Sequence, residues 1–515
     1  MSSAPSESKA FCARWPVVAA LVVALALHLW GIKRDLPFAP DSDEPAFVSP
    51  AVAMAATGNA NPRWFGHPGS TVIYPLAAFY GVWQGSKAQA AFDADPYVFY
   101  LLGRLLSIAY AVLSLPLVYA IGRRVFDRRV ACVAVWLAAL HPVAVMHAQM
   151  VRTDSAGTFF TLLGLWLCLR LRERPTLRNH LAAGAAIGLG IATRYFMVLL
   201  ALVLAVVDAA LLKRSRGTPA FARTLREAVA GFAAVPLAFA VSTPFFFLDL
   251  ASVVNSLGAE AEASHPGADG LSPIGNFLWY ATTAIPGAIT WPQVLLAILG
   301  AALAWRARHV LALSLLVGFP LIFVGAISTS NLHWQRWIIQ LLPLFALLAA
   351  KGAVALADFI GERLRGPWAA PRAWTIVVTA LALALPLAQI VLMDLRGSRP
   401  SSRVLAREWI LQNIPAGTRI AQEWYAAPLS GTGFAVAERF SLAEKGKLEA
   451  YPDEGYRYVV ASSYVYDRFF AEPGRYAAQI AFYRDLFARG RLMQRWEPSS
   501  TRGGPAIAIY ELSTR

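Results

Sequence analysis

Acidic side chains gather near the start of the chain, in the run Asp41-Ser42-Asp43-Glu44 between Pro40 and Pro45. Three carboxylates within four residues repel one another, so they favour a nearby cation, a metal ion or an acidic proton. A pair of acids at a lipid–water boundary suits general-base catalysis on a hydroxyl group, with Asp43 and Glu44 as the pair. A solvated turn between the two prolines explains the same residues equally well.

A further acid, Asp154, ends the segment from His147 to Asp154, which lies between two apolar stretches. Arg152 stands two residues before it, so an acid and a base share a short connection at membrane depth, where unpaired charge is costly. We predict a catalytic role for Asp154. The alternative is an Arg152–Asp154 ion pair or an N-cap of the following helix.

Basic and aromatic side chains stand next to each other at two later positions. Arg194 is followed directly by Tyr195, and His333 and Arg336 flank Trp334 in the stretch from Ser330 to Arg336. Arginine binds phosphate as a planar fork, and Trp or Tyr beside it suits the headgroup region of a bilayer. Each position alone fits an interface anchor. Together with Arg152 and the acids, they predict a site of carboxylates and phosphate-binding cations.

Three weaker candidates complete the predicted site. The turn His67-Pro68-Gly69 and Tyr74 fit a substrate-facing loop, and His333 fits a hydrogen-bond donor to substrate or a metal ligand. The sequence contains no Gly-rich phosphate loop, no Walker motif and no zinc spacing such as H-E-x-x-H. We therefore predict no metal-ligating residues, and leave a divalent metal ion as the open alternative among cofactors.

The composition assigns these residues to a membrane protein. Of 515 residues, 57% are hydrophobic and 15% are charged, whereas soluble domains average roughly 25% charged residues. The apolar residues form blocks near the length of about 20 residues that spans a hydrocarbon core. Lipid offers no partners to backbone groups, so these blocks predict a polytopic helical protein. The net charge of +15 resides in connections rather than on one face, which argues against nucleic-acid binding.

We predict about eleven spans, a number that follows from the span length. Their ranges are 15–32, 100–121, 130–148, 155–171, 181–194, 196–212, 228–247, 286–304, 309–327, 337–357 and 373–394. Lys and Arg then concentrate in every second connection, while 249–285 contains neither. By the positive-inside rule, the amino terminus (1–14) is cytoplasmic and the carboxy-terminal region is extracytoplasmic. A cleaved signal peptide over 1–32 is the less favoured alternative.

Two predicted external regions are longer than connectors. The first, 33–99, mixes Pro-rich turns with short apolar pieces that suggest interfacial or re-entrant helices. The second, 395–515, predicts helices over 403–412 and 476–489 and strands over 457–461 and 506–511, and hence a small α/β domain. The transmembrane domain is predicted over 15–394. Cys12, Cys132 and Cys168 lack metal-ligand spacing, and we interpret them as small buried hydrophobic residues.

Over roughly residues 15 to 360 the chain resembles the GT-C glycosyltransferases, and within them glycosyltransferase family 39, which includes protein O-mannosyltransferases and lipid A aminoarabinose transferases. The resemblance rests on Asp43-Glu44, His67-Pro68, Arg104, "HPVAVMHAQMVRTD" and "HWQRWIIQLLPLFALLAAKG". Also similar are "GLGIATRYF" and the carboxy-terminal "AREWILQNIPAGTRI". The chain departs from the family at Gly69, where a second Pro is usual, and at Arg194, where many members have Lys.

This resemblance implies transfer of a sugar from a polyprenyl-phosphate carrier to a lipid, glycan or protein acceptor on the outer face of a bacterial inner membrane, within the cell envelope. It implies Asp43 as the general base, supported by Glu44, and Asp154 as a residue that orients acceptor or donor. Arg194 and Arg336 are the implied contacts to the carrier phosphate. Two other functions are weighed against this one: a transporter or flippase, which would place its charges near the bilayer midplane, and a membrane scaffold.

Overall fold

The computed structural model describes residues 15–37, 41, 43–261, 271–330, 332–364 and 370–512. Residues 1–14, which include Cys12, lie outside this part, as do Pro40 and Ser42. The described residues form two compact units. The helical unit takes its residues from Met1–Ile32, Phe47–Ala91 and Leu102–Ile390, and the α/β unit from Lys33–Ala46, Phe92–Leu101 and Val391–Arg515.

Each apolar block of the sequence forms a helix, because a run of lipid-facing residues must satisfy its backbone groups internally. The first helices are α2 (Trp15–Trp30), α3 (Pro45–Thr57), α4 (Ser70–Gln84), η1 (Gly85–Lys87), α5 (Ala88–Ala94), α6 (Tyr97–Val125), α7 (Arg128–Ala139), α8 (Pro142–Ala148), α9 (Asp154–Glu173), α10 (Leu177–Thr193), η2 (Tyr195–Leu199), α11 (Leu200–Ser215) and α12 (Phe221–Ser242). They are followed by α13 (Phe245–Leu248), α14 (Leu250–Ala261), α15 (Pro273–Trp279), η3 (Tyr280–Ala284), α16 (Ile285–Ile289), α17 (Trp291–Arg306), α18 (Val310–Leu313), η4 (Ser314–Gly318), α19 (Phe319–Ile327), η5 (Gln335–Leu341), α20 (Leu342–Arg363) and α21 (Pro371–Gly397).

The prediction of several apolar spans is confirmed, but the number eleven is not. Within the described residues, six helices are long and apolar enough to cross a membrane, and up to eight if each bent pair is one span. One such pair is α7 and α8, which meet at 59°. The other, from Pro273 to Arg306, bends by 113° at Ile289 and Trp291, where Thr290 has a positive φ. A prediction from hydropathy alone does not detect such bends, because both arms are equally apolar.

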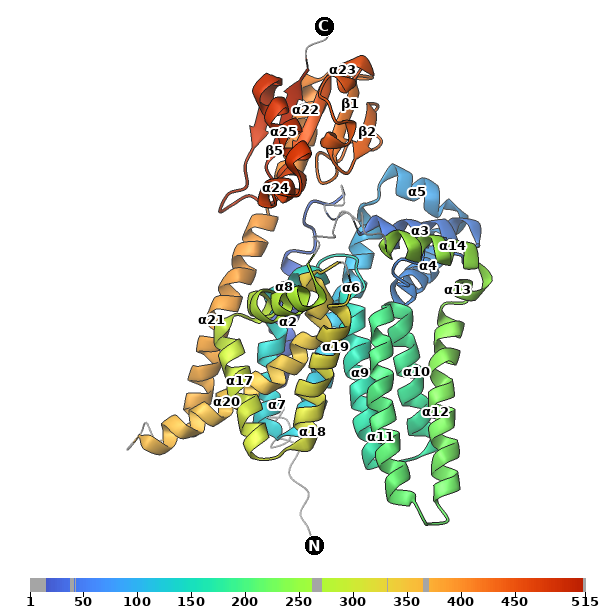
Figure 1. Ribbon diagram of the computed structural model, residues 1–515, viewed down its shortest axis with the longest axis vertical. Helices are drawn as coiled ribbons and strands as arrows, with labels where there is room; N and C mark the ends of the chain where they lie inside the picture. Colours follow the sequence, from blue (N-terminus) through green and yellow to red (C-terminus); the bar gives the residue numbers. More distant parts are fainter. Residues whose placement is uncertain are drawn as a thin grey trace. The chain divides into compact units, whose positions relative to one another are not determined.

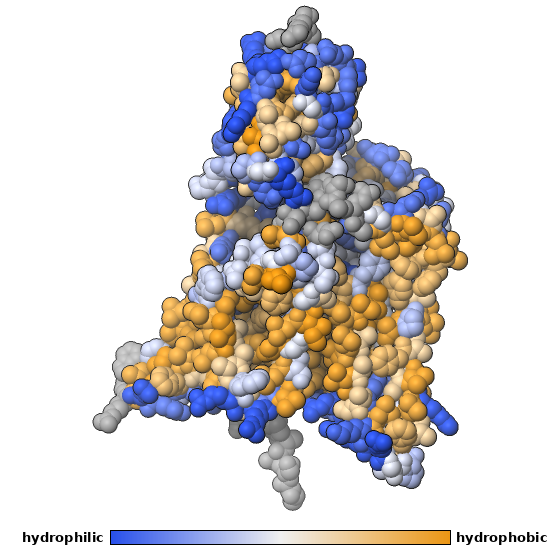
Figure 2. Space-filling view, viewed as in Figure 1, coloured by the Kyte–Doolittle hydropathy of each residue, from blue (hydrophilic) through white to orange (hydrophobic). Residues whose placement is uncertain are grey.

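Helices α9, α10, α11 and α12 lie side by side in the helical unit, with α4 and α14 at one end of them (Figure 1). A Cβ added to Gly184 on α10 would lie 2.0 Å from the carbonyl oxygen of Gly231 on α12, so only glycine permits this close approach. Apolar side chains cover the sides of these helices, and hydrophilic ones gather at the lower ends in the same view (Figure 2).

The α/β unit contains one sheet of five strands, in the order β2-β1-β3-β5-β4. Its elements are α22 (Ser402–Asn413), β1 (Arg419–Glu423), β2 (Ala435–Arg439), η7 (Leu442–Lys445), α23 (Ala450–Asp453), β3 (Tyr458–Ser462), α24 (Ser463–Ala471), α25 (Ala477–Arg489), β4 (Arg491–Trp496) and β5 (Ile507–Glu511). Strand β1 pairs in parallel with β2 and β3, while β5 pairs antiparallel with β3 and β4.

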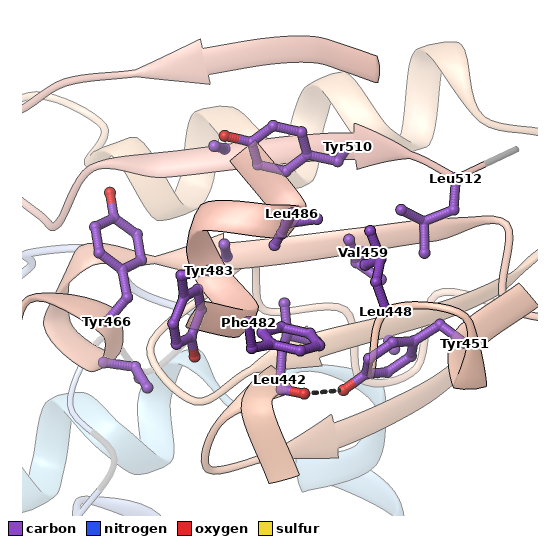
Figure 3. Packing of buried hydrophobic residues seen from close by; sticks show 14 of the residues in the cluster. Leu442, Leu448, Tyr451, Val459, Tyr466, Phe482, Tyr483, Leu486, Tyr510 and Leu512 are labelled. Carbon is purple, nitrogen blue, oxygen red and sulfur yellow. Dashed lines mark hydrogen bonds between the residues drawn. The ribbon is translucent and has the colours of Figure 1, made fainter. Parts of the chain in front are cut away.

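Both faces of this sheet are covered, and β3 is therefore buried along its whole length. Residues of α24 and α25, among them Tyr466, Tyr483 and Leu486, pack with Val459 and Tyr510 on one face (Figure 3). Residues of α22 pack on the other face. The predicted helices over 403–412 and 476–489 and the predicted strands over 457–461 and 506–511 are present within one or two residues, so the small α/β domain is confirmed as a fold.

Candidate functional site

A buried ion pair joins the beginning of α9 to the end of α10. The guanidinium of Arg194 donates to the carboxylate of Asp154, and the two residues are 5% and 2% exposed. Arg194 reaches across because α10 ends at Thr193 and the backbone of Arg194 is extended. The side chain then lies along α9 at Gly157, where an added Cβ would be 3.3 Å from the Arg194 Cδ. A buried pair of this kind persists only when both charges are compensated.

Further charges surround this pair. The Nδ1 of His147 is 3.8 Å from Asp154 Oδ2. Arg336 and Arg152 also stabilise the Asp154 carboxylate electrostatically, after Arg194 and His147 in strength. We call these five side chains the arginine cluster. It contains three arginines and one carboxylate, so its balance is positive, as a site for an oxyanion requires.

The segment that carries Arg336 is fixed by polar contacts with the region before α16. The hydroxyl of Tyr280 accepts from the backbone N–H of Trp334 at 3.2 Å, and Gln335 donates to the Ala284 carbonyl at 3.0 Å. His333 packs its ring on Trp279 with centroids 4.3 Å apart. The Arg336 guanidinium lies over Trp334 at 5.6 Å. These contacts fix the segment that carries Arg336, which is 182 residues from Asp154 in the sequence.

The loop before α4 is attached to the same end of α10. Tyr195 donates its hydroxyl hydrogen to the Phe65 carbonyl at 2.8 Å, and the hydroxyls of Thr71 and Thr193 are 2.7 Å apart. His67 packs edge-on against Trp64 at 5.2 Å. Tyr74 donates to the Ala60 carbonyl at 3.1 Å, further along this loop. Tyr195 therefore anchors the loop, and the substrate contacts predicted for His67 and Tyr74 stay predictions.

Gly69 is the position where the sequence departs from the family pattern of a second proline, and its conformation accounts for the departure. Its φ is +58°, in the left-handed region that proline's ring forbids. An added Cβ would also lie 2.8 Å from the Phe47 ring. The first turn of α4 in this form therefore requires glycine.

Asp43 and Glu44 stand in a tight turn that leads into α3. The backbone N–H of Asp43 donates to Asp41 Oδ1 at 2.9 Å, and the Ala46 N–H donates to the Asp43 carbonyl at 3.1 Å. Glu44 is fully buried and Asp43 is half-buried. A solvated turn, the alternative considered for these residues, does not describe a carboxylate with no exposed surface. This turn belongs to the α/β unit, whereas the arginine cluster belongs to the helical unit.

Comparisons with known proteins now decide the fold. Residues 101–245, which include Asp154 and Arg194, match the model of the family described as dolichyl-phosphate-mannose-protein mannosyltransferase. The structure is similar to ArnT from Cupriavidus metallidurans bound to undecaprenyl phosphate, with TM-score 0.54 and 15% identity over 96% of this chain and 98% of that one. The chain has the GT-C glycosyltransferase fold.

A second GT-C structure supports the same fold. The oligosaccharyltransferase AglB from Archaeoglobus fulgidus, in complex with an inhibitory peptide and a dolichol-phosphate, matches with TM-score 0.51 and 14% identity over 96% of this chain and 74% of that one. A comparison of the sequence with curated proteins gave no match. The resemblance drawn from short motifs is thus confirmed for the fold.

This GT-C structure also contains an apolar cavity of about 530 Å³ in the helical unit. It lies between α9, α11 and the helix from Val310 to Ile327, and we call it the apolar groove. Arg172 and Arg214, in the last turns of α9 and α11, line it. Arg172 is 18 residues beyond Asp154 on α9. At the rise of an α-helix, this separation is about 27 Å along the helix axis.

Aromatic side chains connect the groove to the arginine cluster. Phe319 lines the groove and contacts Phe323 at 6.1 Å between ring centroids. Phe323 in turn contacts Phe196 at 6.3 Å, and the Arg194 guanidinium lies 5.8 Å from the Phe196 ring. A chain of packed aromatic side chains therefore runs from the groove to the arginine cluster.

Two further buried residues were not assigned a role from the sequence. His147 stood in the quoted motif, but only the structure brings it to Asp154. Arg104 is 1% exposed and donates to the Ile32 carbonyl at 2.8 Å, at the end of α2. The signal for Arg104 was an ionisable residue within an apolar span, which is a functional-site hypothesis by default. Among the described residues, no three His, Cys, Asp or Glu side chains form a group that would hold a metal ion.

Proposed function

We propose that this protein transfers a sugar from a polyprenyl-phosphate carrier to an acceptor hydroxyl on the extracytoplasmic face of the membrane. The observation that carries the proposal is the arginine cluster at one end of α9 and α10, joined by aromatic contacts to an apolar groove. A carrier with an anionic phosphate and a long isoprenoid tail needs a cationic site for the phosphate and an apolar surface for the tail. The polyprenyl phosphates bound by the GT-C relatives have this chemistry.

In the proposed reaction, the acceptor oxygen bonds to the anomeric carbon while the bond from that carbon to the phosphate oxygen breaks. The acceptor proton passes to Asp43, and the carrier leaves as a phosphomonoester anion. Arg194 and Arg336 stabilise the charge that develops on the phosphate, because fixed cations in a water-poor site lower the barrier for such leaving groups. Asp154 acts as a positioning residue, since it holds the Arg194 guanidinium in place.

Transport is the competing function, and the position of the charges disfavours it. Asp154 is the first residue of α9, and Arg194 follows the last residue of α10. The cluster therefore lies at helix ends, whereas secondary transporters bind near the bilayer midplane on broken helices.

Mass spectrometry of envelope lipids, glycans and proteins tests the proposal. Cells with the intact gene, a deletion, and a deletion complemented by Asp43→Asn are compared. We expect a sugar-sized mass to disappear in the deletion and in the Asp43→Asn cells, because loss of a general base lowers turnover by about 100-fold or more. Asp358→Asn, which alters an ion pair with Arg129 elsewhere in the helical unit, is the control. Full rescue by Asp43→Asn would refute the catalytic assignment and favour transport.

A further inference from the structure

The α/β unit contains a cavity of about 580 Å³ beyond the carboxyl end of β1. The chain from Gln422 to Pro428 forms one wall, and Asp41, Tyr100, Arg403 and Glu438 contribute to the others. In sheets with parallel strands, ligands bind beyond the carboxyl ends of the strands. Strand β1 is the central strand of the parallel part, so this cavity lies where that rule expects a ligand.

The walls of this cavity carry aromatic faces next to hydrogen-bonding groups. Trp424 is 47% exposed and packs edge-on against Phe440 at 5.6 Å. Gln422 donates to Glu438 Oε1 at 2.7 Å. A sugar ring has an apolar C–H face and a rim of hydroxyls, which match an exposed aromatic face and an amide–carboxylate pair respectively.

The backbone at this wall is strained in a way that ligand sites often show. Tyr425 has a φ of +61°, a conformation that costs a non-glycine residue free energy. Its ring is held by Tyr464 at 5.9 Å, and the guanidinium of Arg468 lies 5.8 Å from it. Arg403 donates to the Ala426 carbonyl at 2.9 Å, which fixes the next residue of the same wall.

The charge in this cavity is opposite to that of the arginine cluster. Asp41 and Glu438 line it, together with Glu423, which burial leaves partly protonated near neutral pH by raising its pKa to about 7, and among the described lining residues Arg403 is the single cation. Asp35 and Asp41 both attract the Arg403 guanidinium, so its charge is balanced locally. The net negative charge here would repel a phosphate. It would not repel a neutral group, and it would attract an amine-bearing one.

The cavity is coupled directly to the turn that carries the proposed base. Asp41 lines it and accepts the hydrogen bond from the Asp43 backbone N–H. Asp41 and Asp43 are two positions apart in the same turn, so a ligand that contacts Asp41 contacts the turn that carries Asp43. A ligand in this cavity would therefore lie beside the turn in which proton removal is proposed.

We infer that this cavity binds the acceptor, and that the acceptor presents a neutral or amine-bearing sugar ring there rather than a phosphorylated one. The inference rests on the proposed function and adds to it the chemical class of the acceptor. It also assigns Trp424, Gln422 and Glu438 as acceptor-binding residues.

The first experiment measures binding to the full chain in lipid nanodiscs. A panel of immobilised neutral, amine-bearing and phosphorylated mono- and oligosaccharides is probed with the unaltered protein. We expect neutral or amine-bearing members to bind, and Trp424→Ala to weaken that binding about tenfold through the lost aromatic contact. Phe470→Ala, which removes another half-exposed ring of the same unit, is the matched control. Binding to phosphorylated members only, or to none, would overturn the inference.

The second experiment separates this inference from the proposed function. Cells lacking the gene are complemented with Trp424→Phe, Glu438→Gln, the control Glu472→Gln or Asp43→Asn, and the transferred sugar is measured. We expect Trp424→Phe and Glu438→Gln to lower transfer and Glu472→Gln to leave it unchanged. If Asp43→Asn abolishes transfer while both cavity variants are silent, the acceptor site is wrong and the transferase stands. If Asp43→Asn is silent, the proposed function itself fails.

Discussion

The two polar regions of this protein are built from opposite charges. In the helical unit, three arginines and His147 surround one carboxylate, and an apolar groove lies further along α9. In the α/β unit, three carboxylates and one arginine line a cavity with exposed aromatic faces. An anionic lipid carrier suits the first region and not the second. Under the proposed function, charge alone would therefore direct the donor and the acceptor to different regions. Four predictions test this contrast, beginning with the largest expected effect.

Breaking the buried pair should have the largest effect. Arg194→Ala removes the hydrogen-bonded partner of the buried Asp154 carboxylate and leaves only the other cations of the cluster to compensate it, which costs up to about 3–5 kcal/mol of stability. It also removes a phosphate contact, so transfer should fall by about 100-fold or more. The double variant Asp154→Asn/Arg194→Gln should be more thermostable than Arg194→Ala, because neither charge is then left alone. Apparent Tm and initial rates on purified protein in nanodiscs measure both effects.

Arg194→Lys serves as the control for the fork geometry, since it keeps the charge but loses the planar donors. An Arg194→Ala variant with unaltered Tm and rate would contradict the assignment of this pair.

Arg336 should affect donor binding with little effect on stability, because it is only partly buried and lies over an aromatic ring. Arg336→Ala is expected to raise the KM for the polyprenyl-phosphate donor about tenfold, the cost of one charge-assisted hydrogen bond. Steady-state kinetics against donor concentration measure this. Arg306→Ala, at the far end of α17, is the control. Equal effects of the two substitutions would show that general positive charge, and not this cluster, binds the donor.

Glu423 should make the α/β unit sensitive to pH. Burial raises the pKa of this carboxyl to about 7, although the Ser462 and Leu442 N–H groups and the Tyr483 hydroxyl donate to it. Its ordinary value is 4.5. Between these values the folded state binds more protons than the unfolded state, so stability falls as pH rises through this window. The loss is complete above about pH 7 and amounts to about 3 kcal/mol at most.

The apparent Tm of the full chain between pH 5 and pH 8 measures this dependence. Glu423→Gln should flatten it, and Glu472→Gln, at an exposed site, should not. A profile unaltered by Glu423→Gln would show that another group causes the dependence.

Gly69 should have the smallest effect. Gly69→Ala is expected to lower stability by about 1–2 kcal/mol, because alanine is disfavoured at positive φ and its Cβ meets Phe47. Gly81→Ala on the same helix is the matched control, since nothing lies within 4 Å of an added Cβ there. A lower apparent Tm for Gly81→Ala than for Gly69→Ala would contradict the role given to this turn.

The sequence predicted much of the fold and only part of the site. Every predicted span is helical, because an apolar run of sufficient length is a local property, but the spans over 130–148 and 286–304 each contain a bend that hydropathy does not show. The strands over 457–461 and 506–511 were also found, since they are continuous apolar runs. Strand β1 was missed because Gln422 and Glu423 interrupt its apolar pattern. The cavity beyond β1 was missed with it.

The sequence by itself determined which charged residues stand at the ends of the apolar helices. Their partners were decided only by tertiary packing. Asp154 stands two residues from Arg152, yet its hydrogen-bonded ion pair is with Arg194, 40 residues away on the next helix. Tyr195, beside Arg194, donates to Phe65, 130 residues away. The physical reason is that helix formation and membrane insertion depend on neighbouring residues, whereas a charge buried between helices pairs with whatever group the packing brings within hydrogen-bond distance.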